Sequence, residues 1–256
     1  SAVANNDQAV LAQGITPEEL VQYVIANGKP DFAPGEGWKY SNTNYILLGL
    51  AIEAAAGKPL DQLYQERIFG PLGMTNTSYL HGSPEPGAVA DGYTKLPATG
   101  ELAEMTNWNA SQAGAAGAIV STVEDMARYI EALFGGELFR QSQSLAEMLA
   151  FTPLDTEQGM FFMKGYGLGL LSFATPGFTA IGHAGQTPGY QSVWFVAPEA
   201  QTVLVFNTNS GSCLAEFLPI TLKPQDLGLA AAGTFPRPEP DYAGKRALDL
   251  NAFEPA

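Results

Sequence analysis

Apolar residues recur at helical spacing through the first part of the chain and gather into short runs in the last part. The helical spacing, with capping residues before each segment and glycines after it, predicts four helices: residues 16–27, 43–56, 60–68 and 121–134. The first and the last open on capping boxes, Thr16–Glu19 and Ser121–Glu124, in which a hydroxyl and a carboxylate satisfy free amides of the first turn. Ser41 and Asn42 are good helix caps, so Tyr40 lies where a loop meets the second helix.

From Tyr166 onward the pattern changes to β-branched and aromatic runs bounded by turn residues, which is typical of strands. Four strands are predicted: residues 166–173, 178–182, 190–197 and 201–208. Pro198-Glu199-Ala200 predicts that the last two strands pair as an antiparallel hairpin. Residues 75–117 lack periodicity and are predicted to be a long ordered loop, whereas residues 212–222 are predicted to form a helix lying on the sheet.

These elements predict an α+β fold with an antiparallel sheet flanked by helices and a mainly helical lobe. Residues 1–160 are assigned to the helical lobe with its long ordered loops, and residues 161–225 to the strands and C-terminal helix of the sheet lobe. Residues 226–256 are acidic and contain prolines, so they are predicted to be a tail or linker. We expect the active site in the cleft between the two lobes.

The composition excludes several classes of protein. With 256 residues, 46% of them hydrophobic, the chain is long enough to bury a substantial core. A net charge of −14 repels phosphate backbones, so no nucleic-acid partner is expected. One cysteine and two histidines cannot form a Cys/His zinc cluster, and no metal or other cofactor is expected. No signal peptide or integral membrane segment is visible, because charged residues interrupt the apolar runs well short of a bilayer span.

Several catalytic and nucleotide-binding motifs are absent from the sequence. There is no Gly-x-Ser-x-Gly elbow, no His-Glu-x-x-His pair and no Walker A loop. Gly165-x-Gly167-x-Gly169 lies inside a strand pattern and opens no helix, so it indicates close backbone neighbours rather than a dinucleotide loop.

Two short motifs remain, Tyr40-x-Asn42 at a helix start and His183-x-Gly185 at a strand end. Each is common by chance, and the specific signal comes from the order of the surrounding segments. Those segments are, along the chain, Phe32–Glu36, Trp38–Tyr45, Ile68–Met74, Ala116–Asp125, Gly165–Gly169 and Gly182–Tyr190. Over roughly residues 16–210 the set resembles the serine β-lactamase and D-alanyl-D-alanine carboxypeptidase family, the class C-like penicillin-recognising hydrolases and related esterases.

The resemblance implies a role for each motif residue. Tyr40 would be the base or proton relay for a serine nucleophile, a role that needs nearby cations because the ordinary pKa of tyrosine is about 10. Asn42 would hold the substrate and the family's catalytic lysine through its side-chain amide. His183 would be a cation or hydrogen-bond donor, and the backbone N–H of Gln186 one of two oxyanion donors. Gly185 would permit the close approach of the substrate.

One position departs from the family's usual pattern. Carboxypeptidases and β-lactamases of the family typically place a hydroxyl residue between the cation and the glycine, where it binds a substrate carboxylate. This chain has Ala184 there, and His183 replaces the commoner lysine. An esterase or amidase with a looser acyl site is therefore as compatible with the sequence as a carboxypeptidase or β-lactamase.

A complete member of the family has a Ser-x-x-Lys motif upstream of Tyr-x-Asn, yet no serine of this chain has a lysine three residues later. We therefore expect the chain to be the C-terminal part of a larger hydrolase, inactive without an N-terminal segment that carries the nucleophile. The expected reaction is acyl transfer to water from an amide, ester or β-lactam bond of a small-molecule or peptide substrate, through an acyl-serine intermediate. The resemblance also implies a periplasmic or secreted location.

Alternatives stay open at this stage. A catalytically inactive module of the same fold would bind peptides or a protein partner through the same cleft. A Ser-His-Asp hydrolase would use His183, although no nucleophile elbow accompanies it. Taken singly, Asn42 is compatible with a plain helix cap, Tyr40 with packing and His183 with a strand end.

Overall fold

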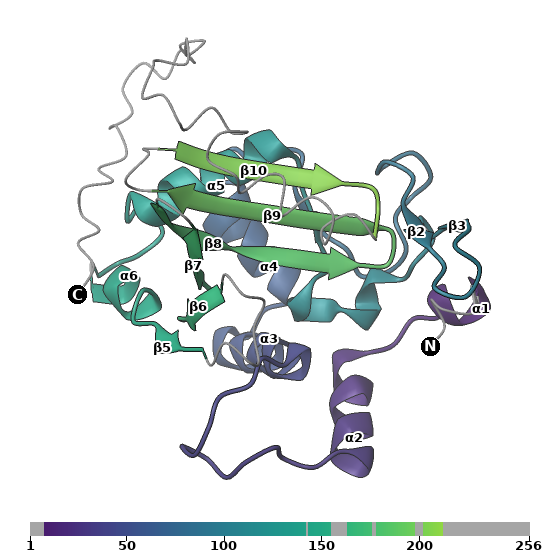
Figure 1. Cartoon of the computed structure of the whole chain (residues 1–256), viewed down its shortest axis with the longest axis horizontal. Helices are drawn as coiled ribbons and strands as arrows, with labels where there is room; N and C mark the ends of the chain where they lie inside the picture. Colours follow the sequence, from purple (N-terminus) through teal and green to yellow (C-terminus); the bar gives the residue numbers. More distant parts are fainter. Residues whose placement is uncertain (1–7, 142, 155–162, 176–177, 198–201, 212–256) are drawn as a thin grey trace. The chain divides into compact units, whose positions relative to one another are not determined.

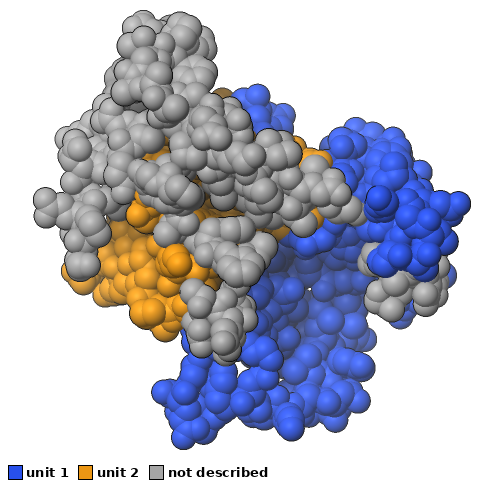
Figure 2. All heavy atoms as spheres, in the orientation of Figure 1, with its two compact units in different colours: residues 1–125, 186–190, 209–211 blue, residues 126–185, 191–208, 212–256 orange. Residues whose placement is uncertain are grey.

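The computed structural model describes residues 8–141, 143–154, 163–175, 178–197 and 202–211 (Figure 1). The chain divides into two compact units (Figure 2). Unit 1 comprises residues 1–125, 186–190 and 209–211, and unit 2 comprises residues 126–185, 191–208 and 212–256. The first division along the chain thus falls near residue 125. The lobe boundaries from the sequence stay a prediction, since the proposed helix at 212–222 and tail at 226–256 lie outside the described residues.

The helices of unit 1 follow the sequence pattern closely. They are α1 (Gln8–Leu11), α2 (Pro17–Asn27), α3 (Asn42–Ala56) and α4 (Leu60–Tyr64), the last continued by the π-helical turn η1 (Gln65–Phe69). The capping box of α2 is confirmed. The Thr16 hydroxyl accepts the Glu19 N–H at 3.1 Å, and the Glu19 carboxylate accepts the Thr16 N–H at 2.8 Å. The short helix α1 was not predicted.

The segment predicted as a long ordered loop contains several short elements. It includes the strands β1 (Ser78–Tyr79), β2 (Tyr93–Lys95) and β3 (Leu102–Glu104) and the 3-10 turns η2 (Ala110–Gln112) and η3 (Gly114–Ala116). β1 pairs with β4 (Ile119–Val120), and β2 pairs with β3, both antiparallel. Two and three residues are too few to produce a recognisable alternation, which is why the sequence pattern did not predict these strands.

Helix α5 (Val123–Phe134) begins at a buried hydrogen-bond network in unit 1. The fully buried Asp125 carboxylate accepts the Asn76 N–H at 2.8 Å and the Thr77 hydroxyl at 2.9 Å. The hydroxyls of Thr77 and Ser121 share a hydrogen bond of 2.7 Å. The Asp125 N–H donates instead to the Thr122 hydroxyl, at 3.3 Å. The predicted cap at Ser121 is therefore wrong by one residue, because the Ser121 hydroxyl bonds across to Thr77 and Thr122 caps the helix.

Unit 2 is built on a six-stranded sheet whose strands follow the order β10-β9-β8-β7-β6-β5. The strands are β5 (Thr152–Pro153), β6 (Met163–Tyr166), β7 (Leu171–Thr175), β8 (Phe178–Thr187), β9 (Tyr190–Ala197) and β10 (Thr202–Thr208). β9 and β10 pair antiparallel, as predicted, although the predicted turn at 198–200 lies outside the described residues. The helix α6 (Gln143–Met148) was not predicted.

The predicted single strand 166–173 is wrong, because the chain turns back within it. β6 ends at Tyr166 and β7 begins at Leu171, and Gly169 in the turn has a φ of 78°, which favours glycine. A Cβ atom on Gly167 would run into the backbone carbonyl of Met148. The interpretation of these glycines as sites of close backbone approach is confirmed at Gly167, whereas Gly169 serves the hairpin turn.

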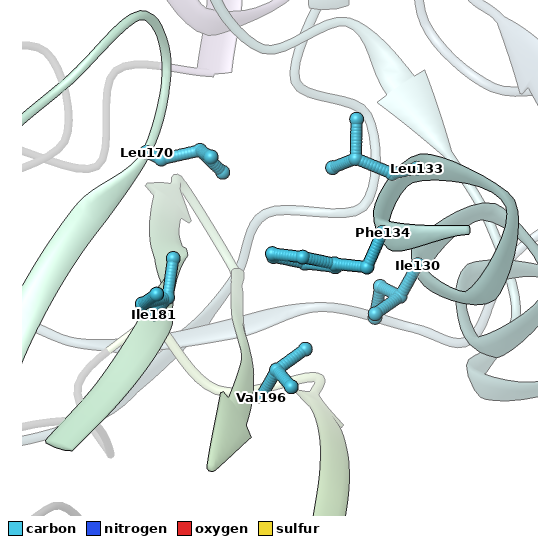
Figure 3. Packing of buried hydrophobic residues seen from close by; sticks show 6 residues of the cluster. All are labelled: Ile130, Leu133, Phe134, Leu170, Ile181 and Val196. Carbon is cyan, nitrogen blue, oxygen red and sulfur yellow. The ribbon is translucent and has the colours of Figure 1, made fainter. Parts of the chain in front are cut away.

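One face of the sheet in unit 2 is covered by α5 (Figure 3). Ile130, Leu133 and Phe134 of the helix form a buried cluster with three residues of the sheet and its turn: Leu170, Ile181 and Val196. The Phe134 ring also meets the Trp194 ring edge-on, at 6.3 Å between centroids. The apolar spacing along α5 thus corresponds to a packed face, and it holds β8 and β9 in place.

Candidate active site

Tyr40 precedes α3 in unit 1 and keeps 42% of its surface exposed. Its ring lies 5.7 Å from the Tyr45 ring. Partial burial raises the pKa of Tyr40 above its ordinary value, and the nearby Tyr45 raises it further by a smaller amount. Lys39, the adjacent cation, forms an ion pair of 2.6 Å with Asp31. Within this unit Tyr40 is therefore a protonated phenol at neutral pH, suited to donate or relay a proton.

Asn42 is the first residue of α3 and is exposed. Ser41 occupies the N-cap position, and its side chain makes no capping hydrogen bond. The interpretation of Asn42 as a plain helix cap is therefore wrong, because the helix starts one residue earlier than its apolar spacing suggested. Its side-chain amide is not used for the capping role that the sequence left open.

His183 lies on β8 in unit 2 and has hydrogen-bond partners on both ring nitrogens. Nδ1 lies 2.7 Å from the Ala184 carbonyl oxygen, and Nε2 lies 3.0 Å from the Tyr166 hydroxyl. Burial lowers the pKa of His183 below its ordinary value, and the hydrogen bond to Ala184 opposes this effect only in part. The partners are a carbonyl and a phenol rather than a carboxylate and a serine. This geometry argues against the Ser-His-Asp alternative.

β8 continues past the end of its pairing with β7. The register of the two strands runs from Phe178 opposite Thr175 to Gly182 opposite Leu171, whereas β8 extends to Thr187. Gly185 and Gln186 are exposed on this extension. In unit 1 the Gln186 side-chain amide donates to the Gly211 carbonyl at 2.6 Å, which fixes the residue whose backbone N–H was predicted as an oxyanion donor.

The closest backbone approach along this part of β8 is at Gly182 rather than Gly185. A Cβ atom on Gly182 would overlap the Trp194 carbonyl of β9 and lie 2.7 Å from the Cα of Phe195. A Cβ atom on Gly185 would meet only the Ser192 hydroxyl, at 3.2 Å. The packing of β8 against β9 therefore requires glycine at position 182. At position 185, which is exposed, the strands would leave room for a larger residue.

We expect Gly182→Ala to destabilise the fold by about 2 kcal/mol or more, because backbone atoms cannot move aside as a side chain can. Gly185→Ala is the matched control, and we expect a change within about 1 kcal/mol because the Ser192 hydroxyl can rotate. Denaturant unfolding of both variants measures the difference. Equal loss of stability in the two variants would contradict the assigned approach at Gly182.

The predicted site residues form two groups. Tyr40 and Asn42 lie together at the start of α3 in unit 1, and His183, Ala184 and Gly185 follow one another on β8 in unit 2. Gln186, the next residue of β8, is counted with unit 1. The structure describes each group within its own unit, so their meeting at one cleft stays a prediction.

The sequence pattern did not reveal Tyr166 as a partner of His183. Tyr166 was quoted only as part of the Gly165–Gly169 segment, and its hydroxyl reaches His183 because the chain turns back after β6. A buried tyrosine usually needs a hydrogen-bond partner, which was the one available signal. That signal does not indicate which residue the tyrosine hydroxyl will bond to.

Unit 1 also contains a pocket of about 420 Å³, formed by a segment of the chain other than those that carry the predicted site residues. It is lined by seven residues of α4, η1 and β1: Asp61, Gln62, Gln65, Glu66, Phe69, Ser78 and Tyr79. Burial, Tyr64 and the nearby carboxylates of Glu53 and Asp61 raise the pKa of Tyr79 to about 12. None of the predicted site residues lines this pocket.

Two further features bear on the possible classes of function. Among the residues that the structure describes, no cluster of His, Cys, Asp and Glu side chains has the arrangement of a metal site. Within the same described ranges, no helix is both long enough and apolar enough to span a membrane.

Comparison with known proteins gives consistent matches. The sequence matches the family described as Beta-lactamase over residues 2–216. It is 28% identical over 203 residues to penicillin-binding protein 4* of Bacillus subtilis, covering 75% of this chain and 44% of that protein. It is 27% identical over 207 residues to a D-aminopeptidase of Cereibacter sphaeroides, covering 78% of this chain and 37% of that protein. The chain thus spans less than half the length of these two relatives.

Solved structures support the same conclusion. The D-amino acid amidase from Ochrobactrum anthropi SV3, complexed with D-phenylalanine, is similar with a TM-score of 0.74 at 28% identity, covering 86% of this chain and 66% of that one. The predicted α+β fold is confirmed by this similarity and by the antiparallel sheet and helices described above. Since the family match extends over most of the sequence and includes both motif groups, the chain belongs to the beta-lactamase family.

Proposed function

We propose that the chain is part of a serine hydrolase that transfers an acyl group from an amide, ester or β-lactam bond to water through an acyl-serine intermediate. The family supports hydrolysis of this type, and relatives named as D-aminopeptidase and D-amino acid amidase support amide or peptide bonds. The observation that carries the proposal is the pair of motif groups, Tyr40-x-Asn42 at the start of α3 and His183-x-Gly185 on the part of β8 beyond its pairing with β7.

Each group supplies part of the chemistry in this proposal. Tyr40 accepts the proton that leaves the nucleophile, either as a base or as a relay that passes its own phenol proton onward, and a proton is then delivered to the leaving group. Asn42 orients the substrate through its amide, which no capping role occupies. His183 orients the acyl donor, and the N–H of Gln186 is one of two donors to the oxyanion.

The nucleophile in this proposal is supplied by residues outside the 256, because no Ser-x-x-Lys motif occurs among them. The lengths of the relatives are compatible with such a segment, since the chain covers 44% of penicillin-binding protein 4*. Apolar side chains on α3 also leave surface that a further segment can cover: Leu47, Leu48 and Ile52 are each more than two-fifths exposed. The periplasmic or secreted location stays a prediction.

A labelling experiment tests the proposal. We expect the 256-residue chain to form no covalent adduct with a penicillin or a fluorophosphonate probe, and a protein in which a Ser-x-x-Lys segment precedes it to be labelled stoichiometrically on that serine. Intact-mass and peptide mass spectrometry measure both outcomes. A stoichiometric adduct on any serine of the chain itself would refute the assignment of the nucleophile to another segment.

The inactive binding module makes the opposite prediction for the longer protein. Such a module would remain unlabelled by either probe, yet it would bind a peptide ending in D-alanyl-D-alanine in a calorimetric titration. Labelling of the longer protein therefore separates the two candidate functions directly.

A further inference from the structure

Tyr166 lies at the end of β6 with only 8% of its surface exposed. Its hydroxyl is 3.0 Å from His183 Nε2, and the two rings meet edge-on at 5.8 Å between centroids. The position of the ring is set by the sheet rather than by a loop. Tyr166 is in register with Leu171 of β7, and Leu171 is in register with Gly182 of β8, the residue before His183.

The partners of His183 determine which nitrogen carries the proton. A carbonyl oxygen can only accept, so the 2.7 Å contact with Ala184 requires a proton on Nδ1. The lowered pKa of His183 leaves the imidazole with one proton at neutral pH, so Nε2 is an acceptor. The Tyr166 hydroxyl must then donate its proton to Nε2.

We propose that Tyr166 is a positioning residue that, with the Ala184 carbonyl, holds His183 as the neutral Nδ1–H tautomer and thereby makes the His183-x-Gly185 motif favour uncharged acyl donors over donors that bear a free carboxylate. The inference about substrate rests on the proposed hydrolase function, whereas the inference about the tautomer does not. A hydroxyl that donates to Nε2 disfavours protonation of that nitrogen. The motif then offers no cation to a carboxylate, and Ala184 offers no hydroxyl.

Two properties of the site agree with this substrate class. The hydrogen bond is held between a buried tyrosine and a mostly buried histidine, where water competes weakly for the same groups. The net charge of −14 also disfavours anionic substrates. An uncharged amide or ester is therefore a better match for this motif than a peptide ending in a free carboxylate.

The tautomer is tested by nitrogen NMR on the chain labelled with ¹⁵N-histidine, which has only two histidines. A His81→Gln variant assigns the signals. We expect His183 to show a protonated, pyrrole-type Nδ1 and an unprotonated, pyridine-type Nε2 at neutral pH. In Tyr166→Phe, which keeps the ring and removes the hydroxyl, we expect the Nε2 signal to shift downfield because it loses a hydrogen-bond donor.

Either of two results would overturn the assignment: a doubly protonated or Nε2–H imidazole in the unaltered chain, or identical His183 signals in Tyr166→Phe, as expected if the ring only packs. These measurements need no turnover, so they decide the role of Tyr166 even if the proposed hydrolase function fails.

Substrate preference is tested on the longer protein that carries the nucleophile. The quantity measured is the ratio of kcat/KM for a neutral ester to that for the same ester with a free carboxylate. We expect the unaltered protein to favour the neutral ester and Tyr166→Phe to reduce the ratio by about 3- to 10-fold, the usual effect of one hydrogen bond. His183→Lys, which places a cation at the motif, is expected to reduce it further. An unchanged ratio in both variants would refute the link between this motif and substrate charge.

Discussion

Replacing Tyr40 by phenylalanine is expected to slow acylation by about 10²- to 10⁴-fold and to leave the free energy of unfolding almost unchanged. The substitution removes only a hydroxyl from a side chain that is 42% exposed, and the ring contact with Tyr45 is retained. The rate of acylation is measured with a reporter ester in rapid-mixing experiments on the protein that includes the Ser-x-x-Lys segment.

The matched control is Tyr23→Phe, which removes a hydroxyl from an exposed tyrosine on α2. We expect this variant to acylate at the rate of the unaltered protein. If Tyr40→Phe also keeps that rate while both variants remain folded, Tyr40 is a packing residue and the proposed proton transfer is refuted.

A further substitution, in the same acylation assay, distinguishes the two roles that the sequence left open for Tyr40. Burial and Tyr45 both raise its pKa, so the residues of its own unit favour the phenol over the phenolate. A role as general base therefore requires a cation from elsewhere, such as the lysine of a Ser-x-x-Lys motif. Replacing that lysine by methionine should abolish acylation if Tyr40 is a base, and should leave a measurable rate if Tyr40 only relays a proton.

The elements that the sequence predicted well are those specified by neighbouring residues. Thr16 and Glu19 cap α2 through bonds three residues apart, and the run from Tyr190 to Ala197 corresponds to β9 without any change of boundary. Such features depend on local spacing, and local spacing is visible in one sequence. The family resemblance likewise depended on short segments in a fixed order.

The features that the sequence did not reveal depend on long-range contacts. The cap of α5 moved from Ser121 to Thr122 because Thr77, 44 residues away, forms a hydrogen bond with Ser121. His183 was predicted as a cation or hydrogen-bond donor, but the sequence pattern did not show that the Tyr166 hydroxyl, 17 residues away, would lie 3.0 Å from its Nε2. Spacing alone cannot show which of several polar residues will meet across a sheet or between a loop and a helix.

The largest loss of stability is expected for Asp125→Ala, which removes a fully buried carboxylate. The Asn76 N–H and the Thr77 hydroxyl would lose their acceptor in a place that water does not readily reach. Hydrogen bonds to a charged group contribute about 1.5–3 kcal/mol each, so we expect destabilisation of about 3–5 kcal/mol. This is a large share of the total stability of a typical domain, about 5–15 kcal/mol.

Glu124→Ala is the matched control, because Glu124 is the adjacent residue, has the same charge and is exposed in the first turn of α5. Its removal loses only a favourable interaction with the helix dipole, about 0.3–1 kcal/mol. Asp125→Asn should lie between the two, because both hydrogen bonds end on the same carboxylate oxygen, Oδ2, and an amide oxygen in that place still accepts both but carries no charge. Denaturant unfolding of the three variants gives the order. If Asp125→Ala is no less stable than Glu124→Ala, the buried network does not hold residues 75–77 to the start of α5, and the cap at Thr122 acts alone.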